Sequence, residues 1–203
     1  IELTRRALAA GTSTIILTPE IGLTAQLTRS FTAAFTERVY VLHSRLTAAA
    51  RRDIWHSIIS STAPVIVIGP RSALFPPVQR LGLIVIDESH DQAYKSDSSP
   101  HYRTERVAAR LAQLHGACLV SGTATPSIEE YYLLEAKKRP IITLRSLAVT
   151  STAEVATKTV DLRDRSNMTR SSILTTPLVE AIQSALGSHE QSLLFLNRRG
   201  TAS

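Results

Sequence analysis

Short runs of large aliphatic residues alternate along the chain with segments whose apolar residues recur every three or four positions. The aliphatic runs lie at 14–17, 39–42, 65–68, 83–86 and 117–120. Such runs are typical of strands that are covered on both faces, whereas the intervening segments have the period of amphipathic helices. The alternation predicts right-handed βαβ crossovers, and therefore an α/β domain with a parallel sheet flanked by helices.

Local signals place the ends of several helices. A helix is predicted from Leu3 to Ala10, ended by Gly11, and Thr47 is a suitable N-cap for the helix that follows it. Pro126 is expected as the first residue of the helix after the run 117–120. Further strands are predicted at 141–144, 160–162 and 192–196, and a further helix is predicted over 178–186.

The composition changes after residue 145. Residues 146–159 are rich in Ser, Thr and Ala and show no period, which is typical of a linker. We therefore expect a first domain over 1–145, a linker over 146–159 and the beginning of a second domain over 160–203.

Composition and charge narrow the class of protein. With 203 residues, 43% of them hydrophobic, the chain can bury a sizeable core, and its net charge of +6 suits a polyanionic partner, with nucleic acid first. The single cysteine, Cys118, excludes a disulfide framework and a cysteine-built zinc site, and its apolar neighbours predict that it is buried. No apolar stretch approaches the ~18 residues of a membrane span, so we expect a cytoplasmic protein without a membrane partner.

Polar residues follow the predicted strands. They are Thr18-Pro19-Glu20, His43-Ser44, Gly69-Pro70-Arg71-Ser72, Asp87-Glu88-Ser89-His90 and Ser121–Thr125. Carboxyl ends of parallel strands meet at one edge of a sheet, where nucleotides bind, and an aspartate there commonly holds the Mg²⁺ that bridges phosphate oxygens. Asp87 is expected to hold this metal and Glu88 to polarise a water. The structural alternative is that both carboxylates are only the polar end of a buried strand.

The ordered motifs resemble the primosomal replication-restart DNA helicases, the primosomal protein N′ (PriA) family of helicase superfamily 2. The resemblance covers essentially the whole chain and rests on the segments 18–24, 41–44, 68–75, 86–91, 94–95, 121–126, 160–163 and 195–200. It implies RecA-like P-loop NTPase lobes, with most of the first lobe in 1–145 and the beginning of a second lobe in 160–203.

The resemblance implies a role for each matching position. Asp87 would be the Mg²⁺ ligand and Glu88 would orient the hydrolytic water. His90 would be a third catalytic residue. For His90 and for His43, the alternative is a structural histidine whose ring nitrogens are hydrogen-bonded within the protein. Ser121, Thr123 and Thr125 would couple the nucleotide site to DNA, although Thr125 could instead be a helix N-cap. The positions expected to follow the backbone of single-stranded DNA are Pro19, Glu20, Gly22, Gly69, Arg71 and Ser72, and an ordinary surface turn is the alternative at Gly69-Pro70.

Residues 91–106 resemble the aromatic-rich loop that couples DNA binding to ATP turnover through stacking on bases. Tyr94, Lys95 and Tyr102 match the family, so we expect them to be coupling residues. Pro100 stands where some members have tryptophan, and Glu105-Arg106 replaces an Arg-Asp pair. These departures predict a weaker stacking platform. The alternative is a solvated, serine-rich surface loop.

Expected family features are missing from the sequence. No G-x-x-x-x-G-K-[ST] loop occurs, and residues 1–10 match the helix that follows this loop in the family. The zinc-binding cysteines and the arginine finger are expected beyond Ser203. We therefore expect an internal fragment that is inactive by itself, with ATP and Mg²⁺ as cofactors, and Zn²⁺ bound by full-length relatives but not by this chain.

The resemblance implies an ATP-dependent 3′→5′ DNA helicase of the primosome, which couples ATP hydrolysis to translocation on single-stranded DNA in replication restart at stalled forks. Its expected partners are single-stranded and forked DNA, primosome and replisome-loading proteins, and single-stranded DNA-binding protein. The alternative is a helicase-derived scaffold that binds fork DNA and primosome proteins without ATP turnover. A metal-dependent nuclease using Asp87, Glu88 and His90 is disfavoured because no second acidic cluster is evident.

Overall fold

The computed structural model describes residues 1–19, 21–35, 39–146, 156–169 and 174–195. The chain divides into two compact units, residues 1–142 and residues 143–203. Among the described residues, no helix is long and apolar enough to cross a membrane.

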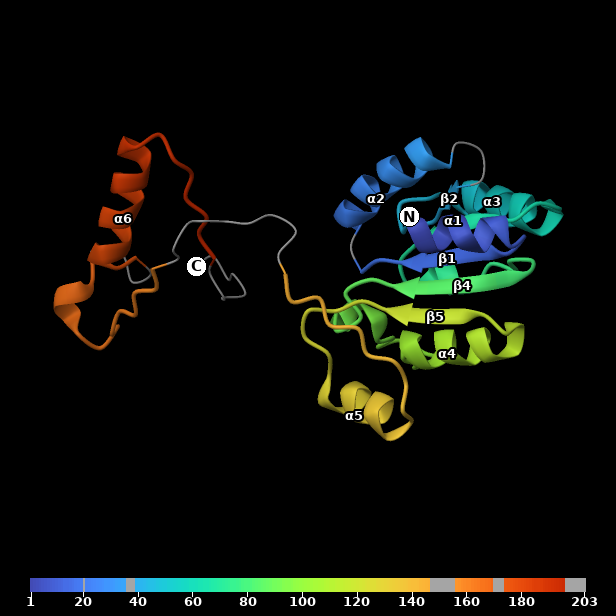
Figure 1. Ribbon diagram of the computed structural model, residues 1–203. Coiled ribbons are helices and arrows are strands. Elements are labelled where there is room, and N and C mark those ends of the chain that lie inside the picture. The colour runs from blue at the N-terminus through green and yellow to red at the C-terminus, as the bar shows by residue number, and fades with distance from the viewer. Residues whose placement is uncertain (20, 36–38, 147–155, 170–173, 196–203) are drawn as a thin grey trace. The chain divides into compact units, whose positions relative to one another are not determined.

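The first unit is built on a parallel sheet of five strands (Figure 1). The strands are β1 (Ser13–Leu17), β2 (Val39–Val41), β3 (Ile66–Gly69), β4 (Leu81–Ile86) and β5 (Cys118–Ser121). Their order across the sheet is β2-β3-β1-β4-β5, and every pair of neighbours is parallel. The prediction of an α/β domain with a parallel sheet is confirmed.

Successive strand residues pack on opposite faces of the sheet. On β1, Ile15 and Leu17 belong to one cluster of buried side chains and Ile16 belongs to another. Helices α3 (Ala48–Ser60) and α4 (Thr104–His115) pack against the first cluster, whereas α1 (Glu2–Ala9) and α2 (Ile21–Ala34) pack against the second. Because helices cover both faces, the strands are almost uniformly aliphatic.

The helix ends follow from local chemistry. Thr47 caps α3, because its side chain accepts a hydrogen bond from the Ala50 N–H at 3.2 Å, and Gly116, with φ of 64°, ends α4. The prediction that Pro126 opens the next helix is wrong. Helix α5 (Ile128–Ala136) has Ser127 as its N-cap, and the Ser127 hydroxyl accepts from the Glu130 N–H at 3.2 Å. Ser127 and Glu130 have the spacing of a capping box, which is a stronger start signal than a proline alone.

The prediction that Cys118 is buried is also wrong. Cys118 is exposed, and no residue of β5 is fully buried. Within the described sheet, β5 lies at the edge and has a neighbouring strand on one side only. An apolar run therefore predicts the strand correctly but not how much of its surface is covered.

The second unit contains α6 (Thr176–Gly187) and a short 3₁₀ turn, η3 (Arg165–Asn167). Helix α6 confirms the predicted helix. The strands predicted at 141–144, 160–162 and 192–195 are not formed, and residue 196 lies outside the described residues. A strand needs a partner for its backbone groups, and Leu193 and Phe195 are 97% and 89% exposed. Most of the predicted linker also lies outside the described residues, so the division at 146–159 stays a prediction.

Candidate functional site

The strand ends bring the polar segments together at one edge of the sheet. In the strand register, Leu17 pairs with both Gly69 and Ile86, and Ile86 pairs with Ser121. Backbone pairing continues one residue beyond the end of β4, because the Asp87 N–H donates to the Leu17 carbonyl at 3.0 Å. The segments after β1, β3, β4 and β5 therefore share one edge, as parallel pairing requires.

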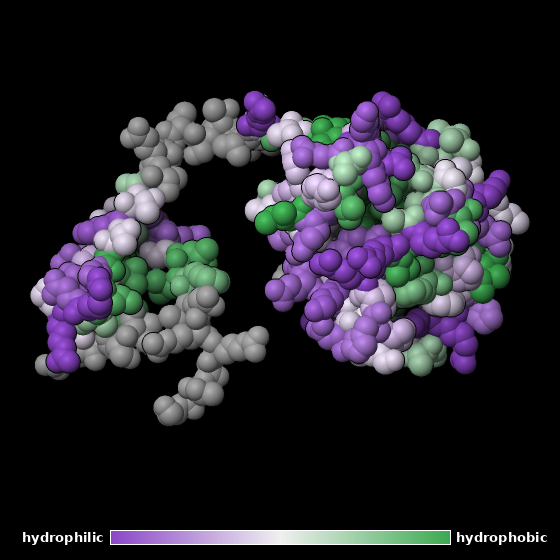
Figure 2. Space-filling model, turned by 90° about the horizontal axis from the view of Figure 1, so that it is seen from below, coloured by the Kyte–Doolittle hydropathy of each residue, from purple (hydrophilic) through white to green (hydrophobic). Residues whose placement is uncertain are grey.

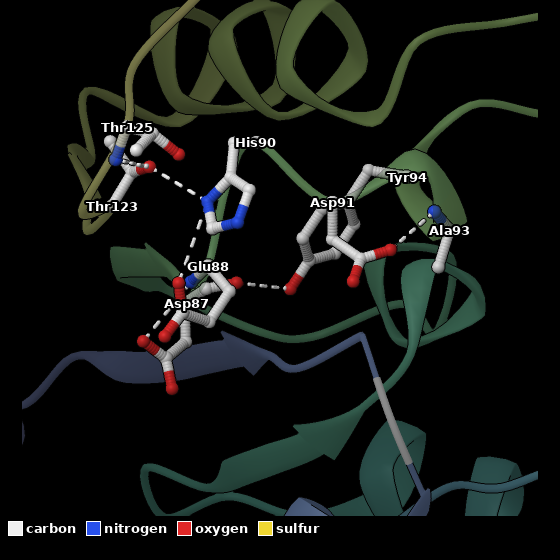
Figure 3. A network of polar contacts seen from close by, with 8 residues as sticks. All are labelled: Asp87, Glu88, His90, Asp91, Ala93, Tyr94, Thr123 and Thr125. Atoms are coloured by element: carbon white, nitrogen blue, oxygen red, sulfur yellow. Dashed lines mark hydrogen bonds and ion pairs between the residues drawn. The ribbon is translucent and has the colours of Figure 1, made fainter. Parts of the chain in front are cut away.

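The turns after β4 and β5 are joined by hydrogen bonds (Figure 3). The Gly122 N–H donates to the Ile86 carbonyl at 2.8 Å, and the Ser89 N–H donates to the Gly122 carbonyl at 2.9 Å. The Nδ1 atom of His90 lies 2.8 Å from the Thr123 hydroxyl and 3.5 Å from a carboxylate oxygen of Glu88. The structure thus brings Glu88, His90 and Thr123 into one polar network.

Glu88 has an unusual backbone conformation. Its φ is +49°, in the left-handed region, and its N–H donates to an Asp87 carboxylate oxygen at 3.1 Å. A non-glycine residue there costs about 1–3 kcal/mol, and such residues cluster at functional sites. The turn leaves the Glu88 side chain 45% exposed while the neighbouring Ser89 is buried. The strain thus accompanies a carboxylate that can reach a ligand at the sheet edge.

Tyr94 anchors the loop to this turn. Its ring is only 1% exposed, and its hydroxyl donates to the Asp87 carbonyl at 2.6 Å (Figure 3). Burial raises the pKa of the Tyr94 hydroxyl well above its usual range, and the nearby Asp87 acts in the same direction. Because its ring is buried, Tyr94 does not offer a surface for base stacking in this conformation, and its expected role as a coupling residue stays a prediction. Tyr94 instead connects the loop to the main chain of Asp87.

Two further side chains fix the same loop. The buried Thr104 hydroxyl donates to the Tyr94 carbonyl at 2.6 Å. Arg71, in the 3₁₀ turn η1 (Arg71–Leu74), donates from Nη1 to the carbonyls of Ala93 and Lys95 at 3.0 and 2.6 Å. From the sequence, Arg71 is expected to follow the DNA backbone, and no role is expected for Thr104. The only sequence signal for Thr104 is its place at the start of a helix, which does not reveal a contact with Tyr94.

The other positions that were expected to follow the DNA backbone differ in how exposed they are. Ser72 is exposed and Pro19 is half-buried. Gly69 is buried, and a Cβ atom there would lie 2.5 Å from the Leu42 carbonyl oxygen, so packing within the sheet explains this glycine. Gly22 lies in the first turn of α2, and Glu20 lies outside the described residues.

Three buried polar atoms at these strand ends lack a partner among the described residues. They are Thr18 Oγ1, His43 Nδ1 and Ser89 Oγ. A buried polar group without a partner costs about 1–3 kcal/mol, and such groups are concentrated where a protein has a function to serve. No partner is found for His43 Nδ1 among the described residues, and the role of this histidine stays a prediction.

The acidic residues suit a metal that is shared with phosphate. No group of three or more His, Cys, Asp or Glu side chains that could hold a metal occurs in the described part of the chain. Mg²⁺ commonly takes one or two carboxylates together with phosphate oxygens and water, so Asp87 fits this mode. A two-metal nuclease needs more acidic ligands than the described residues of this edge provide.

The chain resembles known proteins along nearly its whole length. Residues 2–133 match the family model for DEAD/DEAH box helicases. The chain is 39% identical over 204 residues to the replication restart protein PriA of Chlamydia muridarum, covering 98% of this chain and 27% of that protein. It is 34% identical over 198 residues to replication restart protein PriA of Bacillus subtilis, covering 98% of this chain and 24% of that protein.

The Haemophilus influenzae replication restart protein PriA is 38% identical over 195 residues, covering 96% of this chain and 26% of that protein. The chain thus spans about a quarter of the length of these curated relatives. The expected resemblance to the PriA proteins is confirmed, and the parallel sheet with helices on both faces agrees with a RecA-like helicase fold. The chain belongs to the DEAD/DEAH box helicase family.

Proposed function

We propose that this chain forms part of an ATP-dependent 3′→5′ DNA helicase that acts in replication restart at stalled forks. The observation that carries the proposal is the hydrogen-bonded junction between the Asp87 turn and the Ser121–Thr125 turn. A motor needs its hydrolytic residues connected to a segment that responds to DNA. The resemblance to PriA proteins along 98% of the chain supports the pathway.

In this proposal, Asp87 and Glu88 divide the work at the nucleotide. Asp87 would hold the Mg²⁺ of bound ATP, which neutralises charge on the phosphate oxygens. Glu88 orients the attacking water, since its side chain is 45% exposed at the edge of the sheet. His90, 3.5 Å from the Glu88 carboxylate, holds that side chain in place.

Coupling to DNA follows two routes from this turn. The first runs from His90 to Thr123 and from there to the Thr125 N–H, which donates to the Thr123 hydroxyl at 3.1 Å. The second runs through the Tyr94 hydroxyl into the loop that carries Lys95 and Tyr102. Both routes consist of hydrogen bonds that can change when the nucleotide does.

The partners and location belong to the same proposal. Single-stranded and forked DNA are the substrates, and primosome and replisome-loading proteins and single-stranded DNA-binding protein are the protein partners. A protein that acts on bacterial replication forks would work in the cytoplasm. Zn²⁺ would be held by parts of the longer protein outside this chain.

The decisive test is Glu88→Gln in the intact protein. ATP hydrolysis in the presence of single-stranded DNA should fall by about 100-fold or more, because the amide cannot act as a base. Binding of single-stranded DNA should stay unchanged, since Glu88 would contact neither bases nor phosphates of the DNA. Glu135→Gln, at an exposed position near the end of α5, is the matched control and should keep full turnover.

Undiminished hydrolysis by Glu88→Gln would contradict the assignment. Absence of hydrolysis in the unaltered intact protein, with tight binding to fork DNA, would instead support the scaffold alternative. The same assays therefore separate the motor from the scaffold.

A further inference from the structure

The guanidinium of Arg71 joins two segments that follow different strands. Arg71 begins the turn η1 after β3, and its Nη1 atom donates to the Ala93 carbonyl at 3.0 Å and to the Lys95 carbonyl at 2.6 Å. Both carbonyls belong to the loop after β4, 22 and 24 residues further along the chain. Among the described residues, no ion pair is found for Arg71, so these two carbonyls are the partners that hold its side chain.

The loop that Arg71 contacts has little apolar burial of its own. From residue 92 to residue 101, only Tyr94 and Ser96 are buried. Figure 2 shows the first unit from the side on which α4 and α5 lie in Figure 1, and hydrophilic side chains dominate this face. Because exposed segments with few apolar contacts open easily, the conformation of this loop depends on its hydrogen bonds.

Side chains hold three successive carbonyls of the loop. Arg71 donates to the carbonyls of Ala93 and Lys95, and the buried Thr104 donates to the Tyr94 carbonyl between them at 2.6 Å. The two donors come from different elements, η1 and the start of α4. The backbone on both sides of the Tyr94 side chain is therefore fixed.

Tyr94 connects this fixed backbone to the hydrolytic turn. Its hydroxyl donates to the Asp87 carbonyl at 2.6 Å, and a carboxylate oxygen of Asp87 accepts from the Glu88 N–H at 3.1 Å (Figure 3). A displacement of about 1 Å at a reacting centre can cost about 100-fold in rate. A shift of the loop would reach the main chain that carries both carboxylates.

We propose that Arg71 is a positioning residue for ATP hydrolysis, which holds the loop so that the Tyr94 hydroxyl stays on the Asp87 carbonyl. The reaction rests on the proposed helicase function, and the role of Arg71 rests on its two carbonyl contacts. The Nη1 atom of arginine carries two N–H groups and the loop uses both, so a phosphate reaches this nitrogen only after a loop contact breaks. A ligand for a DNA phosphate, the alternative, would act on DNA binding.

Arg71→Gln in the intact protein separates the two roles. The kcat of ATP hydrolysis at saturating single-stranded DNA should fall about 10- to 100-fold, because the loop no longer holds the Asp87 turn in place. Binding of an oligothymidylate should keep the unaltered slope of log K against log salt. A slope smaller by about 0.7, the value for one phosphate on a single strand, or an unchanged kcat would overturn the proposal. Arg110→Gln, which alters an exposed cation of α4, is the matched control and should change neither quantity.

Two further variants separate positioning from a general loss of stability. Thr104→Val removes the hydroxyl that holds the Tyr94 carbonyl, at a completely buried position that DNA cannot contact. It should lower kcat with an unaltered salt slope, and full turnover by this variant would overturn the proposal. Arg71→Lys should restore part of the turnover lost in Arg71→Gln, because one ammonium nitrogen can donate to both carbonyls from a side chain one bond shorter. Circular dichroism establishes that each variant is folded.

Hydrogen exchange of the Ser96 N–H reports on the loop without ATP or DNA. This group donates to the Tyr102 carbonyl at 2.9 Å, and in the 203-residue chain it should exchange at least about tenfold faster in Arg71→Gln. Unchanged exchange would show that Arg71 does not hold the loop, and would overturn the proposal. Glu88→Gln should abolish hydrolysis but leave this exchange unaltered, so a failure of the motor assignment is distinguishable from a failure of the loop contact.

Discussion

Tyr94 and Tyr102 stand in the same loop and match the same family motif, but they lie in different surroundings. Tyr94 is 1% exposed, packs in the core under β4 and donates to the Asp87 carbonyl. Tyr102 is half-buried, touches Phe75 at one edge and lines a hollow at the start of α4. One ring therefore holds the loop to the Asp87 turn, and the other remains partly exposed at the surface.

The polar groups around the two rings differ in the same way. Around Tyr94, the Asp87 carbonyl, the Tyr94 carbonyl and the Arg71 guanidinium are all paired at 3.0 Å or less. Around Tyr102, no hydrogen bond or ion pair with another described residue is found for the side chains of Lys95, Arg103 and Arg106, although the charge of Arg103 lowers the pKa of Glu130. The loop is therefore held by hydrogen bonds around Tyr94 and carries exposed cations near Tyr102.

The largest expected effect comes from removing the anchoring ring. Tyr94→Ala should lower the free energy of unfolding by about 3–5 kcal/mol, the usual cost of deleting a large buried ring. Urea denaturation of the 203-residue chain, followed by circular dichroism, measures this loss.

Tyr102→Ala is the matched variant. Tyr102→Ala should lower the free energy of unfolding by less than half of the loss expected for Tyr94→Ala, because the Tyr102 ring is only half-buried. In the intact protein it should weaken oligothymidylate binding by about 1–3 kcal/mol, the range for losing one base stack. Equal stability losses for the two alanine variants would break the distinction between anchor and platform.

The next effect depends on pH. The pKa of Tyr94 is raised in the folded state, whereas the unfolded chain releases this proton near pH 10. Above about pH 10 the unfolded state binds fewer protons than the folded state, so stability decreases as pH rises, by about 1.4 kcal/mol per pH unit. This contribution is fully present below the unfolded pKa and is lost towards the folded pKa.

Tyr94→Phe isolates that contribution from other groups that titrate at high pH. At about pH 8 the variant should be less stable than the unaltered chain by about 1 kcal/mol, the value of one hydrogen bond. Near pH 11 the difference should shrink or change sign, because only the unaltered chain has the Tyr94 proton to lose. Urea midpoints at the two pH values measure this change; a constant difference would mean that the hydroxyl titrates normally in the folded chain.

The sheet could be predicted because its signal is local. Strands covered on both faces are aliphatic at every position, so runs such as Val65–Ile68 are visible without any neighbour. The same reasoning failed for 192–195, where the residues are apolar but no partner strand is present in the described part of the second unit. Apolar runs show what a segment can bury, and strand pairing depends on residues far away in the chain.

The sequence predicted that the candidate site lies at one edge of the sheet, but it did not predict the hydrogen bonds that connect the residues of the site. The order of strands and polar segments placed Asp87 and Ser121–Thr125 at the same edge, as the register shows. Nothing local could show that Tyr94 folds under β4 or that Arg71 turns towards the Ala93 and Lys95 carbonyls. Aromatic residues in a loop indicate stacking or burial equally well, and only the tertiary contacts decide between them.

The smallest expected effect extends the comparison to the segment after β5, where Ser127 is anchored and Thr125 is exposed. Ser127→Ala should lower the free energy of unfolding by about 1 kcal/mol, because the Glu130 N–H loses its capping acceptor. Thr125→Ala should leave stability almost unchanged, because the hydrogen bond at this position uses the Thr125 backbone N–H and the Thr123 hydroxyl. Urea denaturation of both variants checks the pair. Equal effects of the two changes on stability would contradict the assignment of Ser127 as the cap. The coupling role proposed for Thr125 is tested separately, because it predicts that Thr125→Ala alone lowers DNA-stimulated hydrolysis in the intact protein.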